Sequence, residues 1–217
     1  KVVSISVCYM ASSGGVAERC TPQGVSYNTL PHMVNADGQY LFCKTWEPDL
    51  KEGEEPRALL FHVHGFRCHC GLISPILARL LNGHRILVFS HDHVGHGQSE
   101  GIRGDQMDFD VMTRDVLQHV EMVSAKYPGV PVFLSGQSMG GPIAIRASIQ
   151  RPDLFAGMLL LSPAIRAALL AGMVTTNISL STPYKLRTAF NILKSGKCSL
   201  YILFTYTFLT DWQVLYS

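Results

Sequence analysis

The feature that most constrains the fold of this chain is a Gly-Gln-Ser-Met-Gly segment at residues 136–140. An apolar, β-prone run at residues 130–134 precedes it, and residues 142–148 are typical of a helix. A strand that enters Gly-x-Ser-x-Gly and a helix that leaves it form a sharp, strained turn known as a nucleophile elbow. The pattern therefore predicts that Ser138 lies at the apex of such a turn.

The tight turn accounts for the two glycines that flank Ser138 and for the chemistry expected there. Gly136 and Gly140 stand two residues before and after Ser138, where strand and helix approach closely and leave no room for side chains. The helix directs its N-terminus at the serine, so an oxyanion formed there would meet backbone N–H groups and the positive end of the helix dipole. This arrangement favours acyl transfer. A Gly/Ser turn that matches by chance is the alternative, and the flanking strand and helix argue against it.

Strand-like and helix-like segments alternate through the middle of the chain. The strand-like segments are short and apolar throughout, as expected of strands buried on both faces of a parallel sheet: residues 57–65, 85–90, 130–134 and 155–163. Apolar residues at three- and four-residue steps predict helices over residues 72–81 and 109–123. A turn signal at residues 35–38 before a strand at 39–46 predicts an antiparallel hairpin. We expect an α/β fold with a mostly parallel sheet, helices on both faces and a site at the carboxyl ends of the strands.

Three parts are expected in the 217-residue chain. Residues 1–20 show no sustained period and are interpreted as a loose leader, residues 21–163 as the core, and residues 164–217 as a divergent tail in place of the last strands of the sheet. In the tail, residues 167–174 are a candidate start of a lid helix. The apolar run at 199–209 is shorter than the roughly 20 residues that a membrane helix needs. Three interpretations of this run are open: an interfacial patch, a β-strand, or sequence that was never selected to fold. We favour the third.

Composition and charge exclude some partner classes. Hydrophobic content of 47% with 16% charged residues is typical of a globular protein. A formal net charge of +2 without a run of Lys or Arg gives no basis for nucleic-acid binding. The six cysteines are irregularly spaced and typical of reduced thiols in a reducing compartment. No secretory signal is evident, so we expect a cytoplasmic location.

Several motifs together resemble the monoglyceride lipases of the α/β-hydrolase family. They are the elbow, the strand that ends in His64 and Gly65, the Asp-His-Val-Gly-His-Gly-Gln-Ser loop at 92–99, and the segments 32–43, 114–120 and 155–163. The resemblance covers roughly residues 21–163. It implies hydrolysis of monoacylglycerols to fatty acid and glycerol, peripheral attachment to a membrane surface, and no cofactor.

By position, the resemblance implies that Ser138 is the catalytic nucleophile. It implies that the backbone N–H groups of Phe66 and Met139 form the oxyanion hole. Two departures stand out. After His-Gly the family continues with a small residue, then Gly and Glu, whereas residues 66–68 are Phe-Arg-Cys. Gln137 also stands where the lipases have a histidine before the nucleophile.

No triad acid or base is identifiable in the sequence. In this fold both follow the nucleophile along the chain, yet the last of the nine histidines is His119. The acids after Ser138 are Asp153, in a turn at the opposite end of the sheet, and Asp211, in a segment without family likeness. Because a general base makes a serine nucleophilic at neutral pH, we expect weak activity at best. A non-catalytic lipid-binding remnant is the alternative.

The upstream histidines raise two further hypotheses. His64 and His93 follow strand ends and are the nearest substitutes for the missing base. His91-x-His93-x-x-His96 resembles the first ligand cluster of metallo-β-lactamase-like hydrolases, and His62 and His64 add two more imidazoles. Those enzymes carry an Asp before the last histidine, where this chain has glycine. We therefore expect packing and capping roles for these histidines, and no metal.

Overall fold

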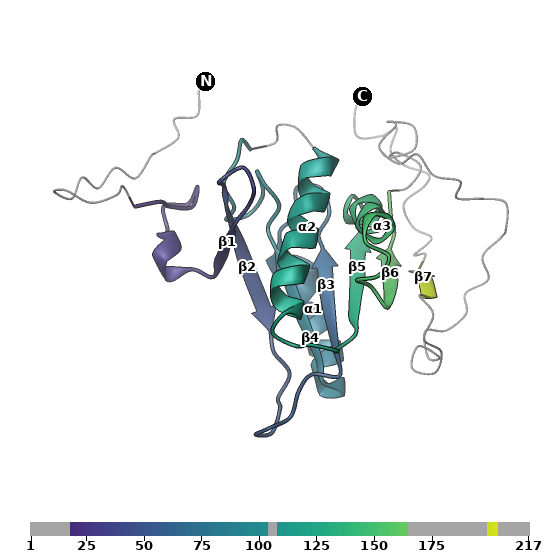
Figure 1. Ribbon diagram of the computed structural model, residues 1–217. Helices are drawn as coiled ribbons and strands as arrows, with labels where there is room; N and C mark the ends of the chain where they lie inside the picture. The colour runs from purple at the N-terminus through teal and green to yellow at the C-terminus, as the bar shows by residue number, and fades with distance from the viewer. Residues whose placement is uncertain (1–17, 104–107, 165–198, 204–217) are drawn as a thin grey trace.

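The computed structural model of the protein describes residues 18–103, 108–164 and 199–203. Within them, one mixed sheet has the strand order β1-β2-β4-β3-β5-β6-β7 (Figure 1). In chain order the strands are β1 (His32–Val34), β2 (Tyr40–Trp46), β3 (Ala58–Val63), β4 (Ile86–His91), β5 (Val132–Gln137), β6 (Gly157–Leu161) and β7 (Ser199–Leu203). The pairs β1/β2 and β2/β4 are antiparallel and the other neighbours are parallel. The predicted mostly parallel α/β sheet is confirmed.

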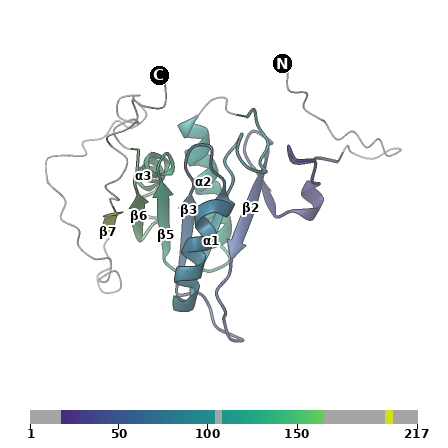
Figure 2. The same cartoon turned by 180° about the vertical axis from the view of Figure 1, so that it is seen from behind.

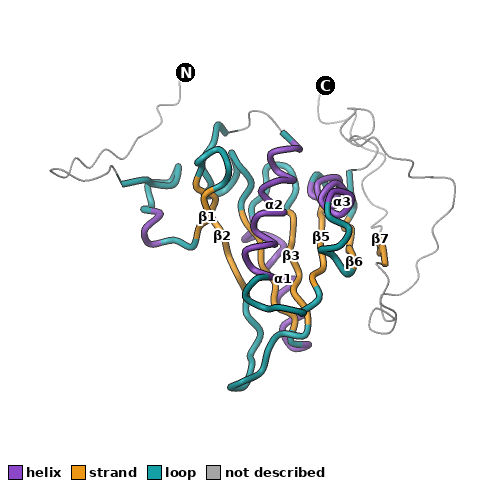
Figure 3. Tube along the Cα trace, viewed as in Figure 1, coloured by secondary structure: helices purple, strands orange, loops and turns teal. Residues whose placement is uncertain are grey.

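Helices cover both faces of this sheet, as predicted. The α-helices of the described residues are α1 (Cys70–Leu81), α2 (Phe109–Ser124) and α3 (Gly140–Gln150), and the 3-10 turns are η1 (Tyr27–Thr29) and η2 (Asn82–His84). Helix α1 lies on one face, and α2 and α3 lie on the other (Figures 1 and 2). Figure 3 shows how strands and helices alternate along the chain. None of these helices is long and apolar enough to cross a bilayer.

Side-chain caps fix where α1 and α2 begin. Helix α1 starts two residues before the predicted position, because the His69 ring accepts a hydrogen bond from the Gly71 N–H at 3.2 Å. Helix α2 starts where predicted, since the Asp108 carboxylate accepts from the N–H groups of Asp110 and Val111. A carboxylate at this end also complements the positive end of the helix dipole.

Strand β3 shows why the predicted strands are apolar throughout. Leu59 and Phe61 point into the larger core, which packs against α2 and α3. Leu60, on the opposite face, packs with Leu77 of α1 in a smaller core. Successive side chains of a strand alternate between faces, and here both faces are covered. An alternating polar pattern is therefore absent from β3.

The predicted hairpin joins β1 to β2 at the edge of the sheet. Asn35 shapes its turn, because the side-chain oxygen accepts from the N–H groups of Asp37 at 3.1 Å and Gln39 at 2.9 Å. The Asn35 side-chain amide also donates to the buried carboxylate of Asp115 on α2 at 3.0 Å. The Asn35 side chain thus both shapes the hairpin turn and joins the hairpin to helix α2.

Two expectations at the ends of the chain need comment. The favoured interpretation of the run at 199–209, a segment that does not fold, is wrong for its first five residues, which form β7, parallel to β6. The open edge of β6 offers unpaired backbone groups, which a β-prone run can satisfy. Residues 1–17 of the expected leader and the candidate lid helix at 167–174 lie outside the described residues. The boundaries of the three parts stay predictions.

Candidate active site

Ser138 occupies a tight turn between β5 and α3. Its φ is 51°, in the left-handed region that few non-glycine residues adopt. The Ser138 N–H donates to the Leu161 carbonyl oxygen at 3.1 Å, and the Ser138 carbonyl accepts from the N–H groups of Gly141 and Ala164, both at 3.0 Å. Backbone bonds to α3 and to the end of β6 therefore hold the strained turn. Ser138 itself is half-buried.

The two glycines of the elbow have no space for a side chain. A methyl carbon at Gly136 would lie 2.5 Å from the Gly140 carbonyl oxygen, and one at Gly140 would lie 2.1 Å from the Val63 carbonyl oxygen. Both clashes are with backbone atoms, which cannot move without shifting a strand or helix. The steric requirement predicted for these positions is confirmed.

The loop that follows β3 packs directly against the elbow. A methyl carbon at Gly65 would lie 3.3 Å from the Ser138 Cβ and 2.6 Å from the Gln137 side-chain oxygen. The next residues form a tight turn in which the Cys68 N–H donates to the Gly65 carbonyl at 3.2 Å and Arg67 adopts a φ of 54°. The segment that carries the Phe66 N–H is thereby held beside Ser138.

The bulky residue in this loop, Phe66, has an exposed side chain. The Phe66 side chain is 43% exposed and contacts the guanidinium of Arg67, 5.3 Å from the ring centre. Within the described residues, no hydrogen bond is recorded from the N–H of Phe66 or of Met139. Backbone N–H groups without a partner are the donors that a developing oxyanion requires, so the oxyanion-hole role of Phe66 and Met139 stays a prediction.

His64, considered above as a substitute base, is occupied by the backbone. Its Nδ1 donates to the Gly65 carbonyl at 2.8 Å, and its Nε2 accepts from the His93 N–H at 3.0 Å. Burial lowers the pKa of His64 to about 3, so the ring is neutral. With both nitrogens engaged, His64 has no lone pair left to accept the Ser138 proton.

His93 does not replace it. Its ring is buried against His64, with 4.3 Å between ring centres, and neither ring nitrogen has a hydrogen-bond partner among the described residues. Burial, followed by the neighbouring His64, lowers the pKa of His93 well below its usual value. A base with so low a pKa would gain a proton poorly at neutral pH.

The described residues give no support to the metallohydrolase alternative. The His91 Nδ1 faces the His119 Nδ1 of α2 at 3.2 Å, while the His96 Nδ1 lies 3.0 Å from the Val94 carbonyl. These contacts engage one nitrogen of each ring, and the ring centres of His93 and His96 lie 6.2 Å apart. No group of three metal-binding side chains occurs in the parts of the chain that the structure describes.

The downstream acid that the structure describes, Asp153, does not approach the serine either. Asp153 lies in the turn between α3 and β6, at the end of the sheet opposite Ser138, and pairs with Arg151 at 2.9 Å. This hydrogen-bonded guanidinium lowers the pKa of the Asp153 carboxyl. Asp211 lies outside the described residues. The acid and base of a triad are thus unassigned.

Asp92, the first residue of the motif at 92–99, organises the loop after β4, a role that the sequence analysis did not assign to it. Its buried carboxylate accepts from the N–H groups of Cys70, the first residue of α1, and Gln98, both at 2.7 Å. A methyl carbon at Gly97 would lie within 1.9 Å of this carboxylate. In the sequence, Asp92 is followed by glycines at positions 95 and 97, a pattern typical of a tight loop. The two hydrogen bonds that its carboxylate accepts depend on tertiary structure and are not visible in that pattern.

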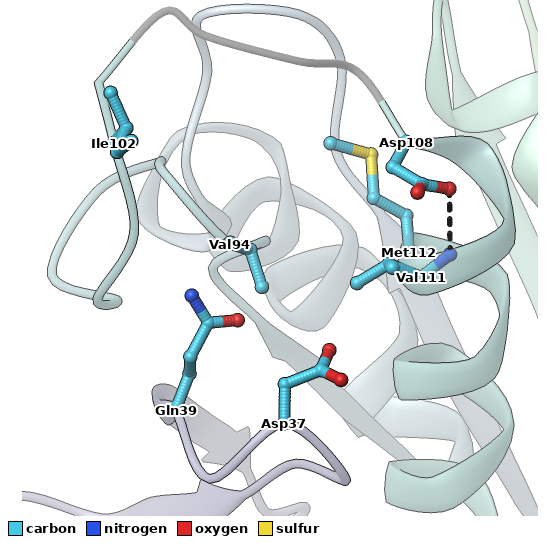
Figure 4. A pocket seen from close by; sticks show the side chains of 7 residues that line it. All are labelled: Asp37, Gln39, Val94, Ile102, Asp108, Val111 and Met112. Atoms are coloured by element: carbon cyan, nitrogen blue, oxygen red, sulfur yellow. Dashed lines mark hydrogen bonds between the residues drawn. The ribbon is translucent and has the colours of Figure 1, made fainter.

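A separate cavity of about 260 Å³ lies between the hairpin turn, the loop after β4 and the start of α2 (Figure 4). It is lined by Asp37, Gln39, Val94, Ile102, Asp108, Val111 and Met112. Ser138 is not among these residues. The predicted nucleophile therefore does not line this cavity.

Comparison with known proteins connects this geometry to a family. The family model described as "Serine aminopeptidase, S33" matches residues 54–195. Monoglyceride lipase of Mus musculus is 54% identical over 149 residues, which cover 69% of this chain and 48% of the lipase. Monoglyceride lipase of Homo sapiens is 56% identical with the same coverage. The chain spans about half the length of these relatives.

Solved structures support the fold alone. Est1E from Butyrivibrio proteoclasticus, solved with ferulic acid bound, has a TM-score of 0.56 at 23% identity, covering 71% of this chain and 60% of Est1E. The predicted resemblance to monoglyceride lipases is confirmed. With the strained serine turn, the sheet order and the family match together, the chain belongs to the serine aminopeptidase S33 family of α/β-hydrolases.

Proposed function

We propose that the protein is a carboxylic ester hydrolase of the monoacylglycerol lipase type, which converts monoacylglycerols to fatty acid and glycerol. The observation that carries the proposal is Ser138, held at a φ of 51° between β5 and α3. The identity of 54–56% to mammalian monoglyceride lipases supports the substrate class.

In the proposed reaction, the Ser138 hydroxyl oxygen bonds to the ester carbonyl carbon and the hydroxyl proton passes to a base. The N–H groups of Phe66 and Met139 stabilise the oxyanion of the tetrahedral intermediate, which collapses to an acyl-serine and releases glycerol. Water then cleaves the acyl-serine to fatty acid. No residue of this chain is assigned as the base, and loss of a triad member costs about 10⁴- to 10⁶-fold in kcat.

A non-catalytic lipid-binding role is the second candidate. It is favoured by the backbone bonds that occupy both nitrogens of His64, which leave that ring unable to act as the base. In this role the loop at Gly65 and the turn at Ser138 would form a site for an acyl ester that is bound and not turned over.

We also propose a cytoplasmic location with peripheral attachment to membranes. Monoacylglycerols are amphiphiles that concentrate at lipid surfaces, so an enzyme acting on them benefits from binding there. Cys43, Cys68 and Cys70 are free thiols, which agrees with a reducing compartment.

The test is to label the 217-residue chain with a fluorophosphonate probe and to measure monoacylglycerol turnover, with Ser138→Ala as the control. We expect labelling that the substitution abolishes, together with slow turnover that is lost in the same variant. A folded sample that binds monoacylglycerol without labelling or turnover would support the second candidate. Labelling that persists in Ser138→Ala would remove the serine from its proposed role.

A further inference from the structure

Helix α1 is apolar on both sides, although only one side packs against the sheet (Figure 2). Its inner residues Leu77 and Ala78 are buried in the smaller core. On its outer side, Leu72, Ile76 and Leu80 follow one another at four-residue steps and are 51%, 51% and 66% exposed. We call these three residues the α1 stripe. A helix that is hydrophobic all round normally has a partner on each side.

Helix α2, which covers the opposite face of the sheet, provides the comparison within the same molecule. Its outward positions include the exposed carboxylates of Asp110 and Glu121. Such charges are what solvent normally selects on the outer side of a surface helix. The α1 stripe is therefore a property of that helix and not of the outer layer in general.

The charged side chains of the segment that contains α1 are all basic. No Asp or Glu occurs between residues 57 and 91. Arg67 and Arg79 are exposed and form no ion pair within the described residues, in contrast to Arg85, which pairs with Glu54 at 3.5 Å. An apolar stripe flanked by unpaired cations matches a surface that combines acyl chains with anionic headgroups.

The stripe begins at the edge of the candidate active site. The Asp92 carboxylate binds the N–H of Cys70 and so fixes the first turn of α1 to the loop at the carboxyl end of β4. The exposed ring of Phe66 comes four residues before α1. A surface bound along α1 would consequently lie close to the loop that packs against Ser138.

We propose that the outer side of α1, with the α1 stripe and the guanidinium groups of Arg67 and Arg79, docks on an anionic lipid bilayer. The proposal rests on the proposed function, for which it names the docking surface. A second copy of the chain is a poorer occupant, because its own α1 surface would carry the same cations and offer them no opposite charge.

Vesicle flotation tests this proposal with the full 217-residue chain. The vesicles are phosphatidylcholine alone, or phosphatidylcholine with about 30% phosphatidylserine to supply negative charge. We expect the unmodified chain to prefer the anionic vesicles, and the double variant Ile76→Ser/Leu80→Ser to partition about tenfold or more weakly into both kinds. Arg79→Gln should weaken binding to the anionic vesicles alone.

The matched control is Met122→Ser/Ile149→Ser, which removes two apolar side chains of similar exposure, 47% and 54%, from α2 and α3 on the other face. It should bind like the unmodified chain, and circular dichroism should show that all variants are folded. Equal binding of stripe and control variants would overturn the proposal. So would stripe-dependent dimers in analytical ultracentrifugation without vesicle binding.

Docking and chemistry are separable in this design. Ser138→Ala should float with anionic vesicles as well as the unmodified chain, because the α1 stripe does not include the serine. Normal flotation without fluorophosphonate labelling would reject the proposed function and keep the docking surface. Normal labelling without flotation would reject the docking surface and keep the proposed function.

Discussion

A methyl group at Gly140 tests the packing on which the turn at Ser138 depends. In Gly140→Ala, the new carbon would lie 2.1 Å from the Val63 carbonyl oxygen and 2.8 Å from that of His64. Both are backbone atoms, so relief requires α3 to move away from the end of β3. Overpacking of this kind costs about 3 kcal/mol, which corresponds to a fall in Tm of about 6–12 °C for a chain of this size.

Thermal unfolding and fluorophosphonate labelling measure the two consequences. We expect the lower Tm together with loss of labelling, since a shift of α3 moves the Met139 N–H and Ser138 together. Gly83→Ala is the control, because a methyl carbon there meets nothing within 4 Å, and its effect should stay within about 0.5 kcal/mol. A Gly140→Ala chain that unfolds within about 1 kcal/mol of the original and still labels would refute the argument.

Three further predictions concern the groups that hold the fold around the site. Burial lowers the pKa of His62 to about 4 and those of His64 and His119 to about 3, below the unfolded value of about 6.5. Urea unfolding should therefore show the full free energy of unfolding above about pH 6.5. Below that pH, each of these histidines should lower the free energy of unfolding by about 1.4 kcal/mol per pH unit. A pH-independent urea midpoint down to about pH 5 would contradict this. Asp92→Asn should cost about 2–3 kcal/mol in the same assay, because two N–H groups lose a charged acceptor. Asn35→Ala should cost about 1–3 kcal/mol through lost turn and α2 contacts, whereas Asn35→Asp should restore the turn bonds only.

Local patterns were enough to predict much of this fold. The apolar strand β3, the hairpin at Asn35 and the helix α2 each depend on neighbouring residues, on burial of both strand faces or on an N-cap, all visible in the sequence. The elbow at Ser138 belongs with them, because its glycines and its flanking strand and helix are contiguous.

The parts that were missed depend on partners distant in the chain. His64 was considered as a base because it follows a strand, but its state is set by the Gly65 carbonyl and by the N–H of His93, which comes from another strand end. The exposed position of the Phe66 ring depends on the tight turn after it. For the run at 199–209, the open edge of β6 decided the outcome, and no local pattern records that edge.

The contact between His91 and His119 requires their two Nδ1 atoms to differ in protonation. Their Nδ1 atoms face each other at 3.2 Å, and a single hydrogen fits between them. One ring must hold that hydrogen and the other must offer its electron pair, so the two nitrogens should give well-separated ¹⁵N resonances. A second hydrogen at this contact would force β4 and α2 apart.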